Sequence, residues 1–328
     1  MLIDPFGRAI TYLRISVTDR CNLRCAYCLP ASGVQWLPAE TLLTLEDIVR
    51  VAQTAANAGI TKIRLTGGEP LVRSDIVEIV HRIAAIPGLN DLSLTTNGLL
   101  LEALAQPLAD AGLKRVNISL DTLDAERYHR ITRFGNLTAV WKGIEAAEAA
   151  GLRPIKLNTV VVNGFNEDEI PSLARLTMEH PWRVRFIELM PLSNQQDWGN
   201  GFPPLPERYY PVQKMHEKLA DLNLVPVPAS PGGGPERTFR IPEALGTLGF
   251  ISPLGDHFCA TCNRLRLTAD GRLRSCLLLD NEISIHAALH SGADLAALLQ
   301  KAVSEKPKGH ELATHNCPES RCMSQIGG

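Results

Sequence analysis

Long apolar runs are absent from the sequence. No stretch approaches the about 20 consecutive apolar residues that a membrane-spanning helix needs, and the first residues lack the features of a signal peptide. A strong excess of one charge is also absent: 33 Lys and Arg stand against 35 Asp and Glu, a net charge of -2. This balance gives no general attraction to nucleic acid or to an anionic membrane. We therefore expect a soluble, cytoplasmic protein in which an anionic substrate meets a local basic cluster.

Cysteine is missing from most of the chain. Of the 328 residues, eight are cysteines, and none lies in residues 29–258. Three lie within residues 21–28 and the rest within residues 259–322. A cytosolic chain uses grouped cysteines as metal ligands more often than as disulfides. The distribution predicts two metal-binding regions, one near each end of the chain.

Short apolar strands alternate with helical patterns over the first 190 residues. Strands are expected at 12–17, 62–66, 92–96, 115–120, 155–162 and 184–189, and helices at 45–58, 75–85, 99–111, 139–150 and 168–178. Thr44 and Asp47 fit a capping box, and Gly59, Gly112 and Gly151 suit helix ends. The repeats predict an α/β fold with a parallel sheet. We expect a partial (β/α)6 barrel resembling a TIM barrel, and a doubly wound sheet also fits the count.

The composition changes after Met190. Residues 191–211 are rich in Pro, Gly, Asn and Trp, and residues 226–235 contain Pro-Gly-Gly-Gly-Pro. This composition is typical of loops. We expect residues 1–190 to form the barrel. Residues 191–328 then form a linker and a smaller C-terminal module that holds the later cysteines, ending in a helical pattern and a polar tail.

The first group of cysteines, Cys21, Cys25 and Cys28, has the spacing C-x3-C-x2-C. Three thiolates on a four-iron cluster leave one iron open to an outside ligand, whereas electron-transfer clusters normally have four. The spacing therefore favours a catalytic iron–sulfur site, with structural zinc or chance grouping as alternatives. Residues 66–70, Thr-Gly-Gly-Glu-Pro, follow the second strand. Their glycine pair permits close approach to a ligand, or forms an ordinary tight turn.

Together, the cysteine motif and the Gly-Gly-Glu-Pro segment resemble the radical S-adenosylmethionine (SAM) superfamily. The resemblance implies a [4Fe–4S] cluster whose open iron binds SAM, and cleavage of SAM to methionine and a 5′-deoxyadenosyl radical. It also implies that Tyr27 lies against the adenine, that Gly68 contacts the methionine amino group, and that Ser119 touches SAM. Met190 is expected near the adenine, and it also fits an ordinary core methionine.

The second group of cysteines consists of Cys259, Cys262 and Cys276. Its spacing fits an iron–sulfur cluster and a zinc site equally well. In the zinc alternative the fourth ligand is His257, Cys317 or Cys322. Apart from that alternative, Cys317 and Cys322 are interpreted as plain thiols.

Arg264 and Arg266 directly follow the second CxxC motif. In a strand they share one face, and guanidinium groups suit bidentate binding of phosphate. A solvated strand face is the alternative interpretation. The segment from Cys259 to Leu267, the third cysteine and the terminal Gly-Gly resemble the GTP 3′,8-cyclase family, also called the molybdenum cofactor biosynthesis protein A family. The likeness covers nearly the whole chain.

This second resemblance implies a GTP site. The second cluster is expected to hold the guanine through an open iron. Gly327-Gly328 is expected to enter the active site, and a disordered terminus is the alternative interpretation of this tail. The expected GTP contacts are Arg14, Arg64, Thr95, Lys156, Arg185, Arg264, Leu265 and Arg266. The expected catalytic residues are Arg264, Arg266 and Arg20. Each basic residue alone also fits a surface charge, and their shared position at the mouth of the sheet argues against that.

The implied reaction converts GTP into (8S)-3′,8-cyclo-7,8-dihydroguanosine 5′-triphosphate, the first step of molybdenum cofactor biosynthesis. It requires two [4Fe–4S] clusters, SAM and an electron donor. The expected protein partners are cyclic pyranopterin monophosphate synthase and a second copy of the chain. Two other classes fit the sequence: a radical SAM enzyme with an auxiliary cluster that acts on a peptide, and a zinc-stabilised binding protein without catalysis.

Overall fold

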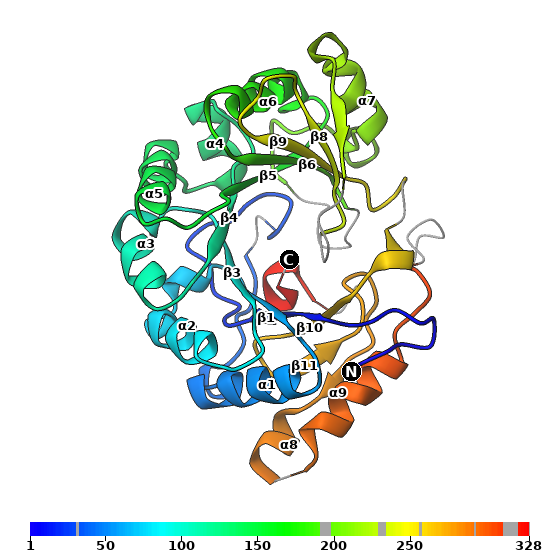
Figure 1. Ribbon diagram of the computed structural model, residues 1–328. Coiled ribbons are helices and arrows are strands. Elements are labelled where there is room, and N and C mark those ends of the chain that lie inside the picture. The colour runs from blue at the N-terminus through cyan, green and yellow to red at the C-terminus, as the bar shows by residue number, and fades with distance from the viewer. Residues whose placement is uncertain are drawn as a thin grey trace.

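The computed structural model describes residues 1–30, 33–190, 198–228, 234–255, 258–291, 293–310 and 321–327. The expected zinc ligands His257 and Cys317, the terminal Gly328, and parts of the expected linker lie outside the described residues. The described strands form one sheet of twelve strands. Figure 1 shows this sheet curving around a central space, with helices on its outer side.

Six parallel strands form the centre of the sheet in sequential order. They are β1 (Tyr12–Ser16), β2 (Lys62–Thr66), β3 (Asp91–Thr96), β4 (Arg115–Ser119), β5 (Lys156–Val161) and β6 (Arg183–Glu188). The six strands predicted from the sequence are confirmed, each within one residue at either end. The α/β fold of the prediction is therefore confirmed.

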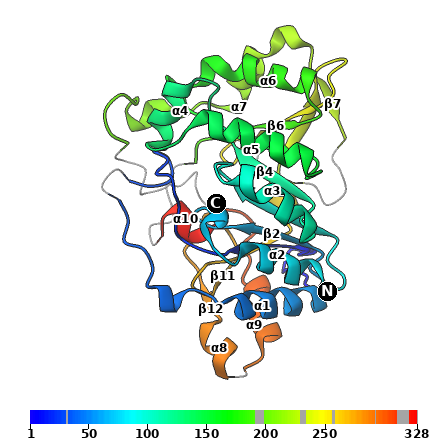
Figure 2. The same ribbon diagram turned by 90° about the vertical axis from the view of Figure 1, so that its left-hand side faces the viewer.

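Helices follow the strands and cover the outer face of the sheet (Figures 1 and 2). They are α1 (Leu45–Asn57), α2 (Ile76–Ala84), α3 (Leu101–Asp110), α4 (Ala125–Thr132), α5 (Leu137–Ala149) and α6 (Ile170–Glu179). The capping box of Thr44 and Asp47 is confirmed at the start of α1. Helix α4 was not predicted, because it buries few apolar side chains. Its start carries a signal that was overlooked, since Asp124 accepts a hydrogen bond from the backbone of Arg127.

Strand alternation sorts the side chains between the core and the interior of the barrel. On β1, Leu13 and Ile15 are fully buried in the core, while Tyr12 and Arg14 line the central cavity. A fully buried aliphatic side chain contributes about 1.5–3 kcal/mol to folding. The outward residues therefore stabilise the contact with the helices, and the inward positions are free to be polar.

The C-terminal module is built on the same sheet and is more regular than its composition indicated. Strand β9 (Thr247–Ile251) pairs in parallel with β6, and β10 (Arg264–Leu267) pairs in parallel with β1. Beyond β9 lie β8 (Arg237–Arg240) and β7 (Val225–Val227), and beyond β10 lie β11 (Arg272–Arg274) and β12 (Ile283–Ser284). The strand position expected for Arg264 and Arg266 is confirmed.

Four further helices belong to the C-terminal half: α7 (Val212–Lys218), α8 (His286–Ser291), α9 (Leu295–Ser304) and α10 (Met323–Ile326). Helix α9 packs beside α1 at one end of the molecule (Figure 2). The short α10 lies inside the ring of strands, so the end of the chain reaches the centre of the barrel (Figure 1). Within the described ranges, no helix has both the length and the apolar character to cross a bilayer.

Candidate active site

The interior of the sheet contains a cavity of about 290 Å³, and residues from both halves of the chain line it. The first triad, defined as Cys21, Cys25 and Cys28, lines this cavity. The expected SAM contacts Tyr27, Gly68, Ser119 and Met190 also line it. So do the expected GTP contacts Arg14, Arg64, Thr95, Lys156, Arg185, Arg264 and Arg266. The structure thus brings together residues that are more than 200 positions apart in the sequence.

Apart from the second group of cysteines, two predicted site residues do not line the cavity. The Leu265 side chain is fully buried in the core, because it alternates with Arg264 and Arg266 on β10. Arg20 is exposed and is not among the cavity-lining residues. Its carbonyl oxygen accepts a hydrogen bond of 2.8 Å from the backbone of Glu69, which ties the Cys21 loop to the Gly-Gly-Glu-Pro turn. Arg20 therefore has a backbone contact beside the site, and the Leu265 side chain lies in the core.

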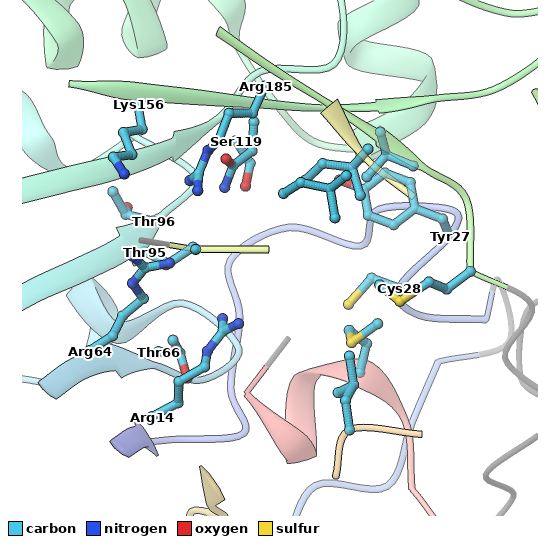
Figure 3. Close-up of a pocket in the computed structure, with 18 of the residues that line it drawn as sticks. Arg14, Tyr27, Cys28, Arg64, Thr66, Thr95, Thr96, Ser119, Lys156 and Arg185 are labelled. Carbon is cyan, nitrogen blue, oxygen red and sulfur yellow. The ribbon is translucent and has the colours of Figure 1, made fainter. Parts of the chain in front are cut away.

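The cavity has two chemically different ends. Figure 3 shows Arg14, Arg64, Lys156 and Arg185 pointing into one side of it. Tyr27 and Cys28 lie on the other side of the view. Cationic nitrogens therefore gather at one end and sulfur at the other.

Three arginines form a row across adjacent strands. Arg14 on β1 is in register with Arg266 on β10 and with Arg64 on β2, and we call these three residues the arginine row. Neighbouring strands lie about 4.8 Å apart, so the row places like charges side by side, which is unfavourable without a counter-charge. Burial lowers the pKa of all three, that of Arg266 to about 10. A bound polyanion would relieve both costs.

A second group of cations lies on β5 and β6 around one buried carboxylate. Glu236 Oε1 lies 2.6 Å from Arg183 Nη1 and 3.7 Å from Lys156 Nζ, and its Oε2 lies 3.0 Å from Arg185 Nη1. Arg185 also donates a hydrogen bond of 3.0 Å to Asn117 Oδ1. Burial alone would raise the pKa of Glu236, but the surrounding cations lower it to about 2. Burial lowers the pKa of Lys156, and the Glu236 carboxylate opposes this shift.

Buried polar atoms without partners mark the cavity as a binding site. Thr95 Oγ1 and Asn158 Oδ1 are both buried, line the cavity, and have no hydrogen-bond partner within the described part of the chain. A buried polar group without a partner is costly, so such atoms at a cavity wall indicate a polar ligand. Asn158 was not predicted, although it lies two positions after Lys156 on the same face of β5.

The Gly-Gly-Glu-Pro turn supports the loop of the first triad. A Cβ atom on Gly67 would collide with the backbone of Thr18, and one on Gly68 with the backbone of Arg20, so only glycine fits both positions. The buried Glu69 accepts hydrogen bonds from Thr96 Oγ1 at 2.8 Å and from the backbone nitrogen of Asn97 at 2.7 Å. Burial raises its pKa to about 7. The turn therefore places a buried carboxyl beside the cysteine loop.

The Tyr27 hydroxyl is held by the carboxyl group of Asp121, which follows β4. The hydroxyl donates a hydrogen bond of 2.7 Å to Asp121 Oδ2, while Asp121 Oδ1 accepts one of 2.9 Å from the backbone of Val160. Burial raises the pKa of Asp121 to about 6. The ring of Tyr27 is thus fixed in orientation at the cavity wall. Asp121 was not predicted as a site residue.

The second triad, defined as Cys259, Cys262 and Cys276, flanks the same cavity. All three cysteines are half-buried, and the neighbouring Phe258, Arg264 and Leu277 line the cavity, whereas the three cysteines are not among its lining residues. Within the ranges that the structure describes, no three His, Cys, Asp or Glu side chains gather closely enough to hold a single metal ion. A tetrahedral zinc ion requires ligands within about 2.3 Å. Thiolates that each bind a different iron of one cluster are spread more widely.

A buried lysine joins the two segments of the second triad. Lys306 Nζ donates hydrogen bonds of 2.8 Å to the carbonyl of Arg264 and 2.6 Å to the carbonyl of Ser275. Burial alone would raise the pKa of Cys262, but Arg264 and Lys306 lower it to about 7. No local sequence pattern marks this lysine, which is 42 positions from its partner Arg264.

The C-terminal tail reaches the arginine row. Arg266 Nη1 donates a hydrogen bond of 2.7 Å to the carbonyl of Gly327, and a Cβ atom on Gly327 would collide with the Thr66 side chain. The tail is anchored by Arg321, which contacts both oxygens of Asp270 at 2.7 and 3.0 Å and also Glu282 at 2.7 Å. The described part of the tail therefore lies in the site.

Comparison with known proteins agrees with this geometry. Residues 15–177 match the radical SAM superfamily, and residues 182–312 match the family described as Molybdenum Cofactor Synthesis C. The GTP 3′,8-cyclase of Moorella thermoacetica is 52% identical over 328 residues, which is 99% of each chain. That of Pelotomaculum thermopropionicum is 51% identical over 330 residues, again 99% of each chain.

Solved structures support the fold alone. A crystal structure of Streptococcus suis SuiB bound to S-adenosylmethionine is similar with a TM-score of 0.62 and 16% sequence identity. The similarity covers 89% of this chain and 68% of that chain. The fold, the first triad and the family match together define a radical SAM enzyme. Within that superfamily, the high identity over the full length shows that the chain belongs to the GTP 3′,8-cyclase family.

Proposed function

We propose that the protein converts GTP into (8S)-3′,8-cyclo-7,8-dihydroguanosine 5′-triphosphate at the start of molybdenum cofactor biosynthesis. The observation that carries the proposal is the two-ended cavity, which has the first triad at one end and the arginine row at the other. A thiolate end suits a metal cluster, and three adjacent guanidinium groups suit a triphosphate. Membership of the cyclase family supports the same reaction.

The residues present fit two [4Fe–4S] clusters and SAM. Each triad supplies three thiolates and so leaves one iron of its cluster open. When bound, the clusters and SAM supply the one-electron radical chemistry that joins ribose C3′ of GTP to C8 of its guanine. The chain's own residues bind the two substrates, hold them in register and keep water away.

The end of the cavity near the first triad suits SAM because it is acidic. Glu69 and Asp121 line this region. SAM carries a sulfonium and an ammonium group, both positive, so buried carboxyls favour its binding. In the proposal Tyr27 and Met190 pack against the adenine, and Gly68 and Ser119 contact the amino-acid and ribose parts. The bond from Tyr27 to Asp121 supports that role because it fixes the aromatic ring.

The other end of the cavity suits GTP. The arginine row and the cations of β5 and β6 bind the triphosphate in this proposal, and Thr95 donates its unpartnered hydroxyl. The guanine lies toward the second triad, near Phe258 and Arg264. Arg264 and Arg266 act as catalytic residues that contact GTP. Leu265 contributes through its backbone, and Arg20 positions the Cys21 loop through its carbonyl.

Partners of the reaction follow from its chemistry. The proposed cyclisation consumes reducing electrons, so an electron donor must reach a cluster. We place the reaction in the cytoplasm and propose cyclic pyranopterin monophosphate synthase as the enzyme that takes the product. We also propose a homodimer as the assembled form. Residues 1–190 supply the SAM site in this proposal, and residues 191–328 supply the second cluster and the tail.

The proposal is tested on protein purified without air. Iron analysis is expected to give about eight iron atoms per chain and no zinc. Incubation with GTP, SAM and a reductant is expected to yield the cyclised nucleotide and 5′-deoxyadenosine. The double variant R264A/R266A should keep both clusters and lose cyclisation. Zinc without iron, or full activity of the double variant, would refute the assignment.

A further inference from the structure

Tyr12 is a buried tyrosine in the cavity wall whose hydroxyl has no partner. Its side chain lines the cavity, and the residue is only 5% exposed. Its hydroxyl makes no hydrogen bond within the described part of the chain. A hydroxyl in such a position normally has a partner, so its acceptor is expected to come from a ligand.

The neighbours of Tyr12 are unable to supply that acceptor. In the sheet, Tyr12 is in register with Arg264 on one side and Lys62 on the other. The Lys62 ammonium lies 4.9 Å from the centre of the tyrosine ring, and the Arg64 guanidinium carbon lies 5.5 Å from it. Lysine and arginine side chains carry only donors. The Tyr12 side chain is therefore surrounded by groups that offer hydrogens and positive charge.

The charge around Tyr12 specifies the kind of acceptor. Burial alone would raise the pKa of Tyr12, but Arg64, Arg14, Lys62 and Arg264 together lower it. Four cations that act on one hydroxyl create a positive potential at that position. A ligand atom that accepts from the hydroxyl and is stabilised by this potential is an anionic oxygen, and phosphate supplies such oxygens.

We propose that Tyr12 is a further substrate-binding residue whose hydroxyl donates a hydrogen bond to a phosphate oxygen of the bound nucleotide triphosphate. This inference rests on the proposed function, because it takes GTP as the anion. It adds a neutral donor to a site otherwise described through its cations. A hydroxyl donates to one oxygen in a defined direction. In this proposal Tyr12 therefore orients the phosphate chain, whereas the cations mainly attract it.

The test compares Tyr12→Phe with Tyr128→Phe in the anaerobically prepared enzyme that carries its clusters. Tyr128 is a matched control because its hydroxyl is also buried and unpartnered in the described structure, but the residue does not line the cavity. Dissociation constants are measured for GTP and for inorganic tripolyphosphate. We expect Tyr12→Phe to weaken both ligands by the same factor, roughly tenfold, and Tyr128→Phe to weaken neither.

Each other result overturns a defined part of the account. If Tyr12→Phe weakens GTP but leaves tripolyphosphate unchanged, the hydroxyl contacts the nucleoside and the phosphate assignment is wrong. If both constants stay at the wild-type value, Tyr12 is no ligand. If both tyrosine variants weaken binding equally, the effect is structural. Wild-type protein that binds neither GTP nor tripolyphosphate would instead refute the proposed function itself.

Discussion

The two triads lie in opposite electrostatic surroundings. Around the first triad, burial is the main influence and raises the pKa of all three thiols, that of Cys21 to about 11, and Glu69 and Asp121 add negative charge nearby. Around the second triad, Arg264 and Lys306 lower the pKa of Cys262 to about 7. The first site is therefore suited to a cationic cofactor and the second to an anionic substrate. In the proposed arrangement, this contrast directs SAM and GTP to different ends of one cavity.

The largest expected effect comes from removing one triad at a time. Changing all three cysteines of the first triad to serine should halve the iron content and abolish cleavage of SAM. The same change in the second triad should also halve the iron content, but SAM cleavage should continue while cyclisation is lost. Iron analysis and chromatography of 5′-deoxyadenosine measure both. Equal loss of SAM cleavage in both variants would contradict the proposal that only the first triad is needed for that step.

Lys306→Met tests whether the cationic surroundings of the second triad are needed to hold its cluster. The variant removes two hydrogen bonds from a charged donor to backbone carbonyls, at about 1.5–3 kcal/mol each, and removes a cation beside Cys262. We expect loss of the second cluster with the first retained, and a clear fall in the melting temperature. Lys301→Met is the control because that lysine is 60% exposed. Retention of all the iron by the Lys306 variant would show that the lysine is dispensable.

Glu236→Gln tests the cation group of β5 and β6. In the proposed site the triphosphate binds the same cations that the carboxylate contacts, so the variant should be less stable without nucleotide and should gain more stability from GTP. The pKa of Glu236 lies below its ordinary value, at about 2. Its ion pairs therefore stabilise the fold above about pH 4.5, and this contribution is lost as the pH falls toward 2.

Thermal unfolding of wild type and Glu236→Gln, with and without GTP and across this acidic range, measures both effects. The wild-type protein should lose its advantage over the variant as the pH falls. An unchanged response to GTP would mean that the carboxylate does not compete with phosphate.

Tyr27→Phe should have the smallest effect. It removes the 2.7 Å hydrogen bond from the hydroxyl to Asp121 and keeps the aromatic ring. We expect the KM for SAM to rise by about fivefold with little change in KM for GTP. If the KM for GTP rises instead, GTP and not SAM lies against Tyr27, and the proposed assignment of the two ends of the cavity is wrong. Steady-state kinetics with each substrate varied in turn distinguishes the two.

The first half of the fold could be predicted because its signals are local. Strands such as Lys62–Thr66 and helices such as Leu45–Asn57 have clear periodicity, caps and glycine ends. The later strands could not be placed in the same way. The pairings of β9 with β6 and of β10 with β1 join segments far apart in the sequence, and no local pattern reports such a pairing.

The residues of the candidate site also differ in whether a local sequence pattern marks them. The cysteines and the arginines carry recognisable motifs, whereas Glu236 and Lys306 act through contacts that only the folded chain brings together. Tyr12 and Asn158 are intermediate cases. Each lies two positions from a predicted site residue on the same strand face, so strict use of strand alternation finds them.

The most direct test of the central claim uses GTP that carries deuterium at ribose C3′. In the proposed arrangement this ribose lies in the same cavity as SAM, between the first triad and the arginine row. Incubation with SAM and a reductant should therefore transfer the deuterium to 5′-deoxyadenosine, as mass spectrometry will detect. Formation of unlabelled 5′-deoxyadenosine alone, with GTP unchanged, would contradict the account.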